Sequence, residues 1–198
     1  MGSIRKVTLD SYAVNPAAGT IEEAESIVLV QADGHWRSPA GAVKDAVVKA
    51  LAGTLDGLKI VDARPKPAEM AADLRAGKMQ ISTEAAATLR PFGFLLTENG
   101  HILGSDGEMS VEMANGVIYQ IRFGDVAATA SDIGKDAGGD RYLFVTTSWD
   151  SGRAMLYGDT GGGEKVSRDL SARFADWFYV IGNADFQKLR LTKADVIQ

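Results

Sequence analysis

Hydrophobic and polar residues alternate through the middle of the chain, and this pattern predicts β-strands with one buried face. From Val117 to Phe123 every second side chain is apolar, and most of the residues between them are polar. Asx-Gly pairs, which readily adopt the backbone angles of tight turns, stand at Asn99-Gly100, Asp106-Gly107 and Asn115-Gly116. We therefore predict an antiparallel meander with strands at residues 94–96, 101–103, 109–113 and 117–123.

The first half of the chain combines a hairpin with an amphipathic helix. Residues 27–31 and 35–37 are predicted strands, joined by the two-residue turn Asp33-Gly34. Apolar residues recur at steps of four from Val43 to Leu55, which predicts a helix over residues 42–55. A strand over residues 58–63 and short helices over residues 68–76 and 83–90 complete this half.

The second half of the chain ends in a similar order of elements. A predicted strand at residues 141–149 precedes a glycine-rich loop, a helix at residues 164–176 and a strand at residues 177–181. On the helix, Leu170 and Phe174 are expected to pack against the sheet, with Arg168 and Asp169 exposed.

The repeated order favours a diverged internal duplication. We predict an α+β protein of two lobes, residues 1–90 and 91–198, packed as one unit. Each lobe is expected to be an antiparallel sheet with helices packed on its faces.

Composition and charge exclude several classes of function. The net charge of −5 and the pI of about 5.1 argue against a nucleic-acid partner, because phosphate binding requires a concentrated basic face. The chain has no cysteine, so disulfide scaffolds, thiol catalysis and thiolate zinc sites are excluded. No apolar run approaches the roughly 18 residues of a membrane span, so we expect no transmembrane segment in this sequence.

A phosphate-binding loop is not favoured by the sequence. Gly158–Lys165 is rich in glycine and follows a predicted short strand at residues 155–157. In a P-loop, glycine, lysine and a hydroxyl residue are consecutive, so that the lysine reaches the phosphates and the hydroxyl binds magnesium. Here Glu164 separates the last glycine from the lysine, and Val166 takes the hydroxyl position. We interpret the segment as a solvated loop.

Metal and hydrolase chemistry have only weak signals. Asp132, Asp136 and Asp140 lack the ligand spacing of an EF-hand, and His35 and His101 do not belong to a set of zinc ligands at short spacing. We predict no cofactor and no metal site, and we favour a non-catalytic protein. The alternative is a hydrolase whose catalytic residues are scattered along the chain.

Trp149 is the aromatic residue that we expect to be partly exposed. It ends a predicted strand and precedes Asp150, whereas Trp36 and Trp177 are interpreted as core residues rather than as a sugar- or peptide-binding face. Binding surfaces are commonly anchored by aromatic side chains. We therefore predict a ligand or partner surface that includes residues 149–163, with Trp149, Asp150 and Arg153 as its candidate binding residues.

Several segments of the chain form a pattern that resembles a known family. They are Asp140–Thr146, Arg173–Ile181, Phe186–Thr192, Asp33–Trp36 and Gly116–Gly124. This pattern is similar to that of the bacterial domain-of-unknown-function family 4340, over most of the chain from about Ile27. Between Trp149 and Leu170 the sequence departs from the family, in which we expect a longer charged insertion.

The resemblance implies a location outside the cytoplasm. Members of this family are typically membrane-anchored, face outward and are often encoded beside ABC transporter components of the gliding-motility type. Because Met1-Gly2-Ser3 looks like an expression start, we expect that a native anchor has been removed; a cytoplasmic location is the alternative. The resemblance implies an extracytoplasmic module, accessory to ABC export, that binds a protein partner at the membrane or a small ligand such as a glycan.

Overall fold

The computed structural model describes residues 3–15, 20–77, 87–97, 99–127, 139–159 and 161–198. The helical elements are α1 (Asp45–Asp56), α2 (Ala68–Arg75), the 3-10 helix η1 (Arg90–Phe92), α4 (Ser151–Leu156), α5 (Gly163–Ala175), α6 (Asn183–Leu189) and α7 (Lys193–Val196). The strands are β1 (Ile4–Asn15), β2 (Thr20–Ala32), β3 (His35–Arg37), β4 (Ile60–Pro65), β5 (Phe94–Leu96), β6 (Ile102–Gly104), β7 (Glu108–Met113), β8 (Val117–Val126), β9 (Arg141–Trp149) and β10 (Trp177–Ile181).

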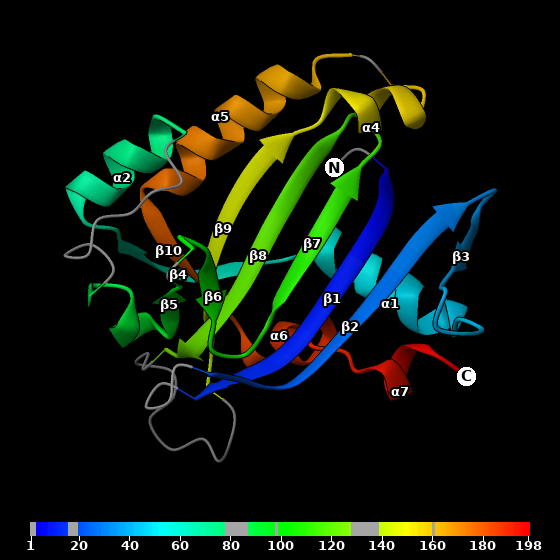
Figure 1. Ribbon diagram of the computed structural model, residues 1–198, viewed down its shortest axis with the longest axis horizontal. Coiled ribbons are helices and arrows are strands. Elements are labelled where there is room, and N and C mark those ends of the chain that lie inside the picture. Colours follow the sequence, from blue (N-terminus) through cyan, green and yellow to red (C-terminus); the bar gives the residue numbers. More distant parts are fainter. Residues whose placement is uncertain (1–2, 16–19, 78–86, 98, 128–138, 160) are drawn as a thin grey trace.

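One sheet of eight strands forms the centre of the molecule (Figure 1). Its strand order is β3-β2-β1-β7-β8-β9-β10-β4, and β5 and β6 form a separate hairpin. The α+β class predicted from the sequence is confirmed. Strands from both predicted lobes belong to this one sheet, because β1 pairs with β7 and β4 pairs with β10.

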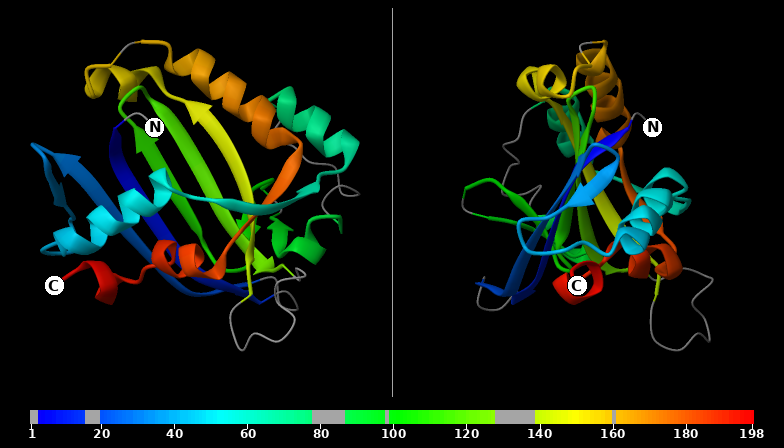
Figure 2. Two further views of the ribbon diagram at one scale, coloured as in Figure 1. Left: turned by 180° about the vertical axis from the view of Figure 1, so that it is seen from behind. Right: turned by 90° about the vertical axis from the view of Figure 1, so that its right-hand side faces the viewer.

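The two faces of the sheet carry different layers. The larger core lies under α1, α5, α6 and α7, and includes Leu29, Leu51 and Phe123. The smaller core lies on the opposite face, where Phe144 and Phe178 pack against α2, η1 and the β5–β6 hairpin. Figure 2 shows the sheet nearly edge-on in its right-hand view, with α1 on one side and the hairpin on the other. The hairpin covers only part of its face, so the rest of that face is open.

The open part of the sheet is polar, as strand alternation requires for a face that borders water. Val7 and Leu9 of β1 point into the larger core, so their neighbours along the strand point to the open side. The strand registers place the residues of this face in three rows across β1, β7, β8 and β9, and all of them are polar except Ile118 and the buried Phe144: Lys6, Glu112, Ile118 and Ser148; then Thr8, Ser110, Gln120 and Thr146; then Asp10, Glu108, Arg122 and Phe144.

Local signals in the sequence predicted most of these elements. Asp33 and Gly34 both have positive φ, of 52° and 79°, as the predicted two-residue turn requires. At the β7–β8 turn, Gly116 has a positive φ of 78° but Asn115 does not. This fits a hairpin whose turn is longer than two residues. Leu170 and Phe174 pack against the larger core, whereas Arg168 and Asp169 are exposed, as predicted.

Three segments differ from the prediction or are not covered by the structure. Strand β1 was not predicted, because irregularities after Ile4 and between Ser11 and Ala13 interrupt its alternation. The predicted strand at residues 155–157 is wrong, because residues 151–156 form helix α4. Most of the predicted helix at residues 83–90 lies outside the described residues.

Candidate functional site

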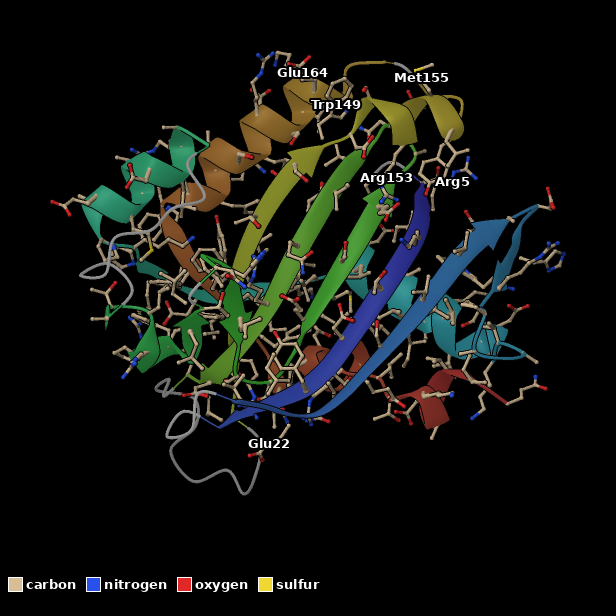
Figure 3. The ribbon with its side chains drawn as sticks, in the orientation of Figure 1. Arg5, Glu22, Trp149, Arg153, Met155 and Glu164 are labelled. Carbon is tan, nitrogen blue, oxygen red and sulfur yellow. The ribbon has the colours of Figure 1, made fainter. Side chains whose placement is uncertain are left out.

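Helix α4 follows strand β9 directly and stands at the upper rim of the sheet (Figure 3). Asp150 has extended backbone angles, and its carboxylate accepts a hydrogen bond of 3.0 Å from the backbone N–H of Arg153. A side chain that satisfies a first-turn N–H favours helix initiation, which is why residues 151–156 are helical. Asp150, a predicted binding residue, is therefore a helix cap.

Trp149 lies beneath the connection between α4 and α5. Its indole N–H donates a hydrogen bond of 3.1 Å to the backbone carbonyl of Asn115, and the side chain is 37% exposed. The ring lies so close to Gly163 that a Cβ at this position would be 2.8 Å from the indole nitrogen and would also collide with the Asn115 carbonyl. Trp149 thus fixes the start of α5 while part of its ring remains open to solvent, as predicted. Trp36 is buried as predicted, but the interpretation of Trp177 as a core residue is wrong, because 43% of this residue on β10 is exposed.

Arg153, the third predicted residue, attaches α4 to the open face of the sheet. Its guanidinium donates to the carboxylate of Glu112, which is only 4% exposed. Lys6 and Tyr157 donate to the same carboxylate, at 3.0 Å and 3.1 Å. A buried carboxylate is tolerated when cations and hydrogen-bond donors surround it. Here Lys6 belongs to β1, Arg153 belongs to α4, and Tyr157 directly follows α4.

The apolar residues of α4 point away from the protein. Ala154 is the one buried residue of this helix, whereas Met155 is 71% exposed and Leu156 is 76% exposed. Figure 3 shows Met155 directed outward at the upper rim, on the far side of α4 from Arg153. We call Trp149, Met155 and Leu156 the α4 tip. Val166, near the start of α5, is also exposed.

A second candidate site is a cleft of about 440 Å³ on the open face of the sheet, beside the β5–β6 hairpin. Arg122 lies at its floor and is 7% exposed. The guanidinium Nε donates to the carbonyl of Ile102 at 2.6 Å, and Nη1 donates to Thr146 Oγ1 at 3.1 Å. The cleft is lined by His101, Ile102, Leu103, Glu108, Ile118, Gln120, Arg122, Thr146, Thr147 and Ser148.

The charged groups of this cleft influence one another. Burial raises the pKa of the Glu108 carboxyl, and neighbouring Asp10 adds to this shift, whereas Arg122 and His101 oppose it. Burial also raises the pKa of the Tyr12 hydroxyl, and Glu108 contributes to that shift. A perturbed pKa in a cleft is typical of functional sites, so the cleft is a candidate binding site alongside the α4 tip.

The weaker sequence candidates have different outcomes. His101 lines the cleft with Glu108, but the described hydrogen bonds do not join its imidazole to a carboxylate or a hydroxyl. His35 is an exposed residue of edge strand β3. Asp132 and Asp136 lie outside the described residues, and Asp140 accepts a hydrogen bond from the backbone of Asn183 at 3.2 Å. Over the described part of the chain, no three potential metal ligands gather into a site.

The surface predicted at residues 149–163 includes the α4 tip, but of the tip residues only Trp149 was named from the sequence, and the cleft was not predicted. The cleft residues come from four strands and one hairpin turn, and no short motif links them.

Among the described helices, none combines the length and the apolar character that a membrane crossing needs. No protein-family model matches the chain, and no curated protein or solved structure shows significant similarity to it. The resemblance to family 4340 stays a prediction.

Proposed function

We propose that this protein is a non-catalytic interaction module and that the α4 tip is the surface that binds its partner. The observation that carries the proposal is the exposure of Met155 and Leu156, at 71% and 76%, on a helix held in place by a buried carboxylate. Exposed apolar side chains that cluster at a rigid position are typical of docking surfaces. A helix needed only for the protein's own core would turn these residues inward.

The polar attachment of α4 supports a presenting role for this helix. Glu112, Lys6, Arg153 and Tyr157 fix the orientation of α4, so Met155 and Leu156 are held outward before a partner arrives. Such preorganisation lowers the entropic cost of association. Trp149 adds a partly exposed aromatic ring, the kind of side chain that often dominates the binding energy of an interface.

The partner that fits this surface is a different protein rather than a lipid bilayer or a second copy. An anionic membrane would favour a basic rim, whereas the residues around the tip carry both signs. A protein interface commonly has this apolar centre and mixed polar rim. Two protruding tips that met across a twofold axis would bury little area, so a groove on another protein is the better match. The charged residues near the tip in the sequence are Asp150, Arg153, Asp159, Glu164, Lys165 and Arg168.

The resemblance described above adds a setting to this proposal. In that setting the module acts outside the cytoplasm, as an accessory of an ABC export system, and its partner lies at the membrane. This part of the proposal rests on the resemblance of segments such as Arg173–Ile181 to family 4340. Fractionation of the native host with an antibody against the protein tests it, since a cytoplasmic signal would contradict it.

Site-specific photo-crosslinking tests the docking surface. Benzoylphenylalanine is placed at position 155 or, as a control, at the exposed position 49 on α1, and the protein is produced in its native host. We expect a single heterologous adduct from position 155 that position 49 does not give. Leu156→Asp should abolish this adduct, whereas Lys49→Asp should leave it unchanged. An adduct with lipid or with a second copy of this protein would overturn the proposal. The same adducts from positions 155 and 49 would overturn it as well.

A further inference from the structure

We propose that the cleft beside the β5–β6 hairpin binds a small organic carboxylate and that Arg122 receives its carboxylate group. This site is separate from the α4 tip and does not depend on the docking proposal. The upper end of the cleft, at Ile118 and Ser148, shares a row of the sheet with Glu112, the carboxylate to which Arg153 attaches α4.

The hydrogen-bonding capacity of Arg122 supports this inference. A guanidinium has five N–H donors in a planar fork that matches a carboxylate. The described acceptors, the Ile102 carbonyl and the Thr146 hydroxyl, account for two of them. Glu108 approaches the Nε of Arg122 only to 3.6 Å, which is longer than a good hydrogen bond. A buried guanidinium at the floor of a cleft therefore retains donors for a ligand.

Glu108 pairs with Arg122 without forming a hydrogen bond to it, since its carboxylate lies 3.6 Å from the Nε of Arg122. Burial raises the pKa of the Glu108 carboxyl and Asp10 in the same row of the sheet adds to this shift, whereas Arg122 and Gln120 oppose it. An incoming carboxylate would accept hydrogen bonds from the guanidinium N–H groups that Ile102 and Thr146 leave unused. In a largely desolvated position such charge-assisted hydrogen bonds are strong.

The volume and the lining of the cleft suit the remainder of an organic carboxylate. A volume of about 440 Å³ lies within the range of small-molecule sites and is far larger than a bare inorganic anion needs. Ile102, Leu103 and Ile118 provide apolar contacts, whereas Gln120 and Ser148 provide amide and hydroxyl groups for hydrogen bonds. The lining thus suits an organic acid that has both apolar and hydrogen-bonding groups.

A binding titration with paired probes tests the charge requirement. N-acetylalanine and succinate carry carboxylates, N-acetylalaninamide and succinamide are their neutral counterparts, and ethylamine is a cation. In two-dimensional NMR of the ¹⁵N-labelled protein, we expect the carboxylates to shift the amide signals of Gln120 and Thr146. Dissociation constants on the order of millimolar are expected for ligands of so few atoms. The amides should bind at least about tenfold more weakly, which corresponds to about 1.4 kcal/mol.

Two variants localise the effect. Ser148→Trp should fill the cleft from its exposed upper end without altering Arg122, and should weaken carboxylate binding about tenfold or more. Ser26→Trp makes the same change on the same face of the sheet, but on β2 outside the cleft, and should leave binding unchanged. Arg122→Lys keeps the charge but loses the fork, and should also weaken binding.

Three results would overturn the inference. They are equal binding of the carboxylates and their amides, preferential binding of ethylamine, and no response of the cleft amides to any probe at tens of millimolar. Carboxylate binding that Ser148→Trp leaves unchanged would place the site elsewhere and would count equally against it. Leu156→Asp at the α4 tip should not affect this titration, so failure of the docking proposal and failure of this inference are distinguishable.

Discussion

Arg153 of helix α4 forms an ion pair with the carboxylate of Glu112, which is buried in strand β7 41 residues earlier in the chain. The pair joins a surface helix to the central sheet, and Lys6 and Tyr157 complete the surroundings of the carboxylate. Because α4 buries only Ala154, this polar attachment rather than a hydrophobic contact decides where the helix stands.

Glu112→Gln is expected to lower the free energy of unfolding by about 1–3 kcal/mol, because the cations that surround it lose their buried counter-charge. Urea unfolding followed by circular dichroism measures this loss. Asp169→Asn is the matched control, since Asp169 pairs with Lys165 on the exposed side of α5. That change should cost far less, because exposed ion pairs are screened by water and contribute little to stability. Equal losses in the two variants would show that burial of Glu112 has no special role.

Trp149→Ala is expected to loosen the α4–α5 connection without unfolding the domain. The variant loses the hydrogen bond to the Asn115 carbonyl and the contact with Gly163, at a cost of about 1–3 kcal/mol. Hydrogen exchange should increase in residues 150–159 and in the first turn of α5, and should stay unchanged in β1 and β2. Partner crosslinking at position 155 should weaken as well. Uniform loss of protection across the sheet would contradict this expectation.

Lys66 gives the protein a predicted dependence of stability on pH. Its ammonium group is buried 4.4 Å from the centre of the Phe144 ring and donates to the carbonyls of Phe174 and Trp177 at 2.6 Å and 2.8 Å. Burial lowers the pKa of Lys66 from 10.5 to about 7. Between these values the unfolded chain binds one more proton than the folded chain, so the free energy of unfolding rises as the pH rises.

Urea unfolding at a series of pH values measures this effect. From about pH 7.5 to about pH 9.5 the rise attributable to Lys66 should be about 2–3 kcal/mol. The Lys66→Met variant has no ionisable group at this position, so its free energy of unfolding should lack that part of the rise. The variant should also be less stable at all pH values, because the carbonyls of Phe174 and Trp177 lose their hydrogen-bond donor. Parallel pH curves for the two proteins would show that Lys66 keeps an ordinary pKa.

Phe174→Ala is expected to cost about 2–4 kcal/mol, because the ring packs against the larger core. It also meets Tyr119 and Tyr179 edge-on, with centroids 6.4 Å and 5.8 Å apart. Arg168→Ala, on the exposed face of the same helix, serves as the control and should change stability by less than about 0.5 kcal/mol. A cost for Phe174→Ala below about 1 kcal/mol would mean that α5 is only loosely attached to the sheet.

The short-range features of this fold could be predicted from the sequence alone. The turns at Asp33-Gly34 and Asn115-Gly116, the alternation from Val117 to Phe123 and the apolar stripe of α1 all depend on residues a few positions apart. Where such signals are interrupted or conflict, prediction failed. The irregularities of β1 hide its alternation, and the apolar run at residues 154–157 suggested a strand although Asp150 caps a helix there.

The pairing of distant strands was decided only by the tertiary structure. Any exposed strand edge offers the same backbone donors and acceptors, so local sequence does not say that β1 pairs with β7 or that β4 pairs with β10. These pairings merge the two predicted lobes into one sheet and bring Glu112 beneath Arg153. The register across β7, β8 and β9 likewise gathers Glu108, Arg122 and Thr146 in one cleft. The sequence by itself determined most of the local elements, but not β1 or α4, and it determined the partial exposure of Trp149. Long-range packing determined both candidate sites.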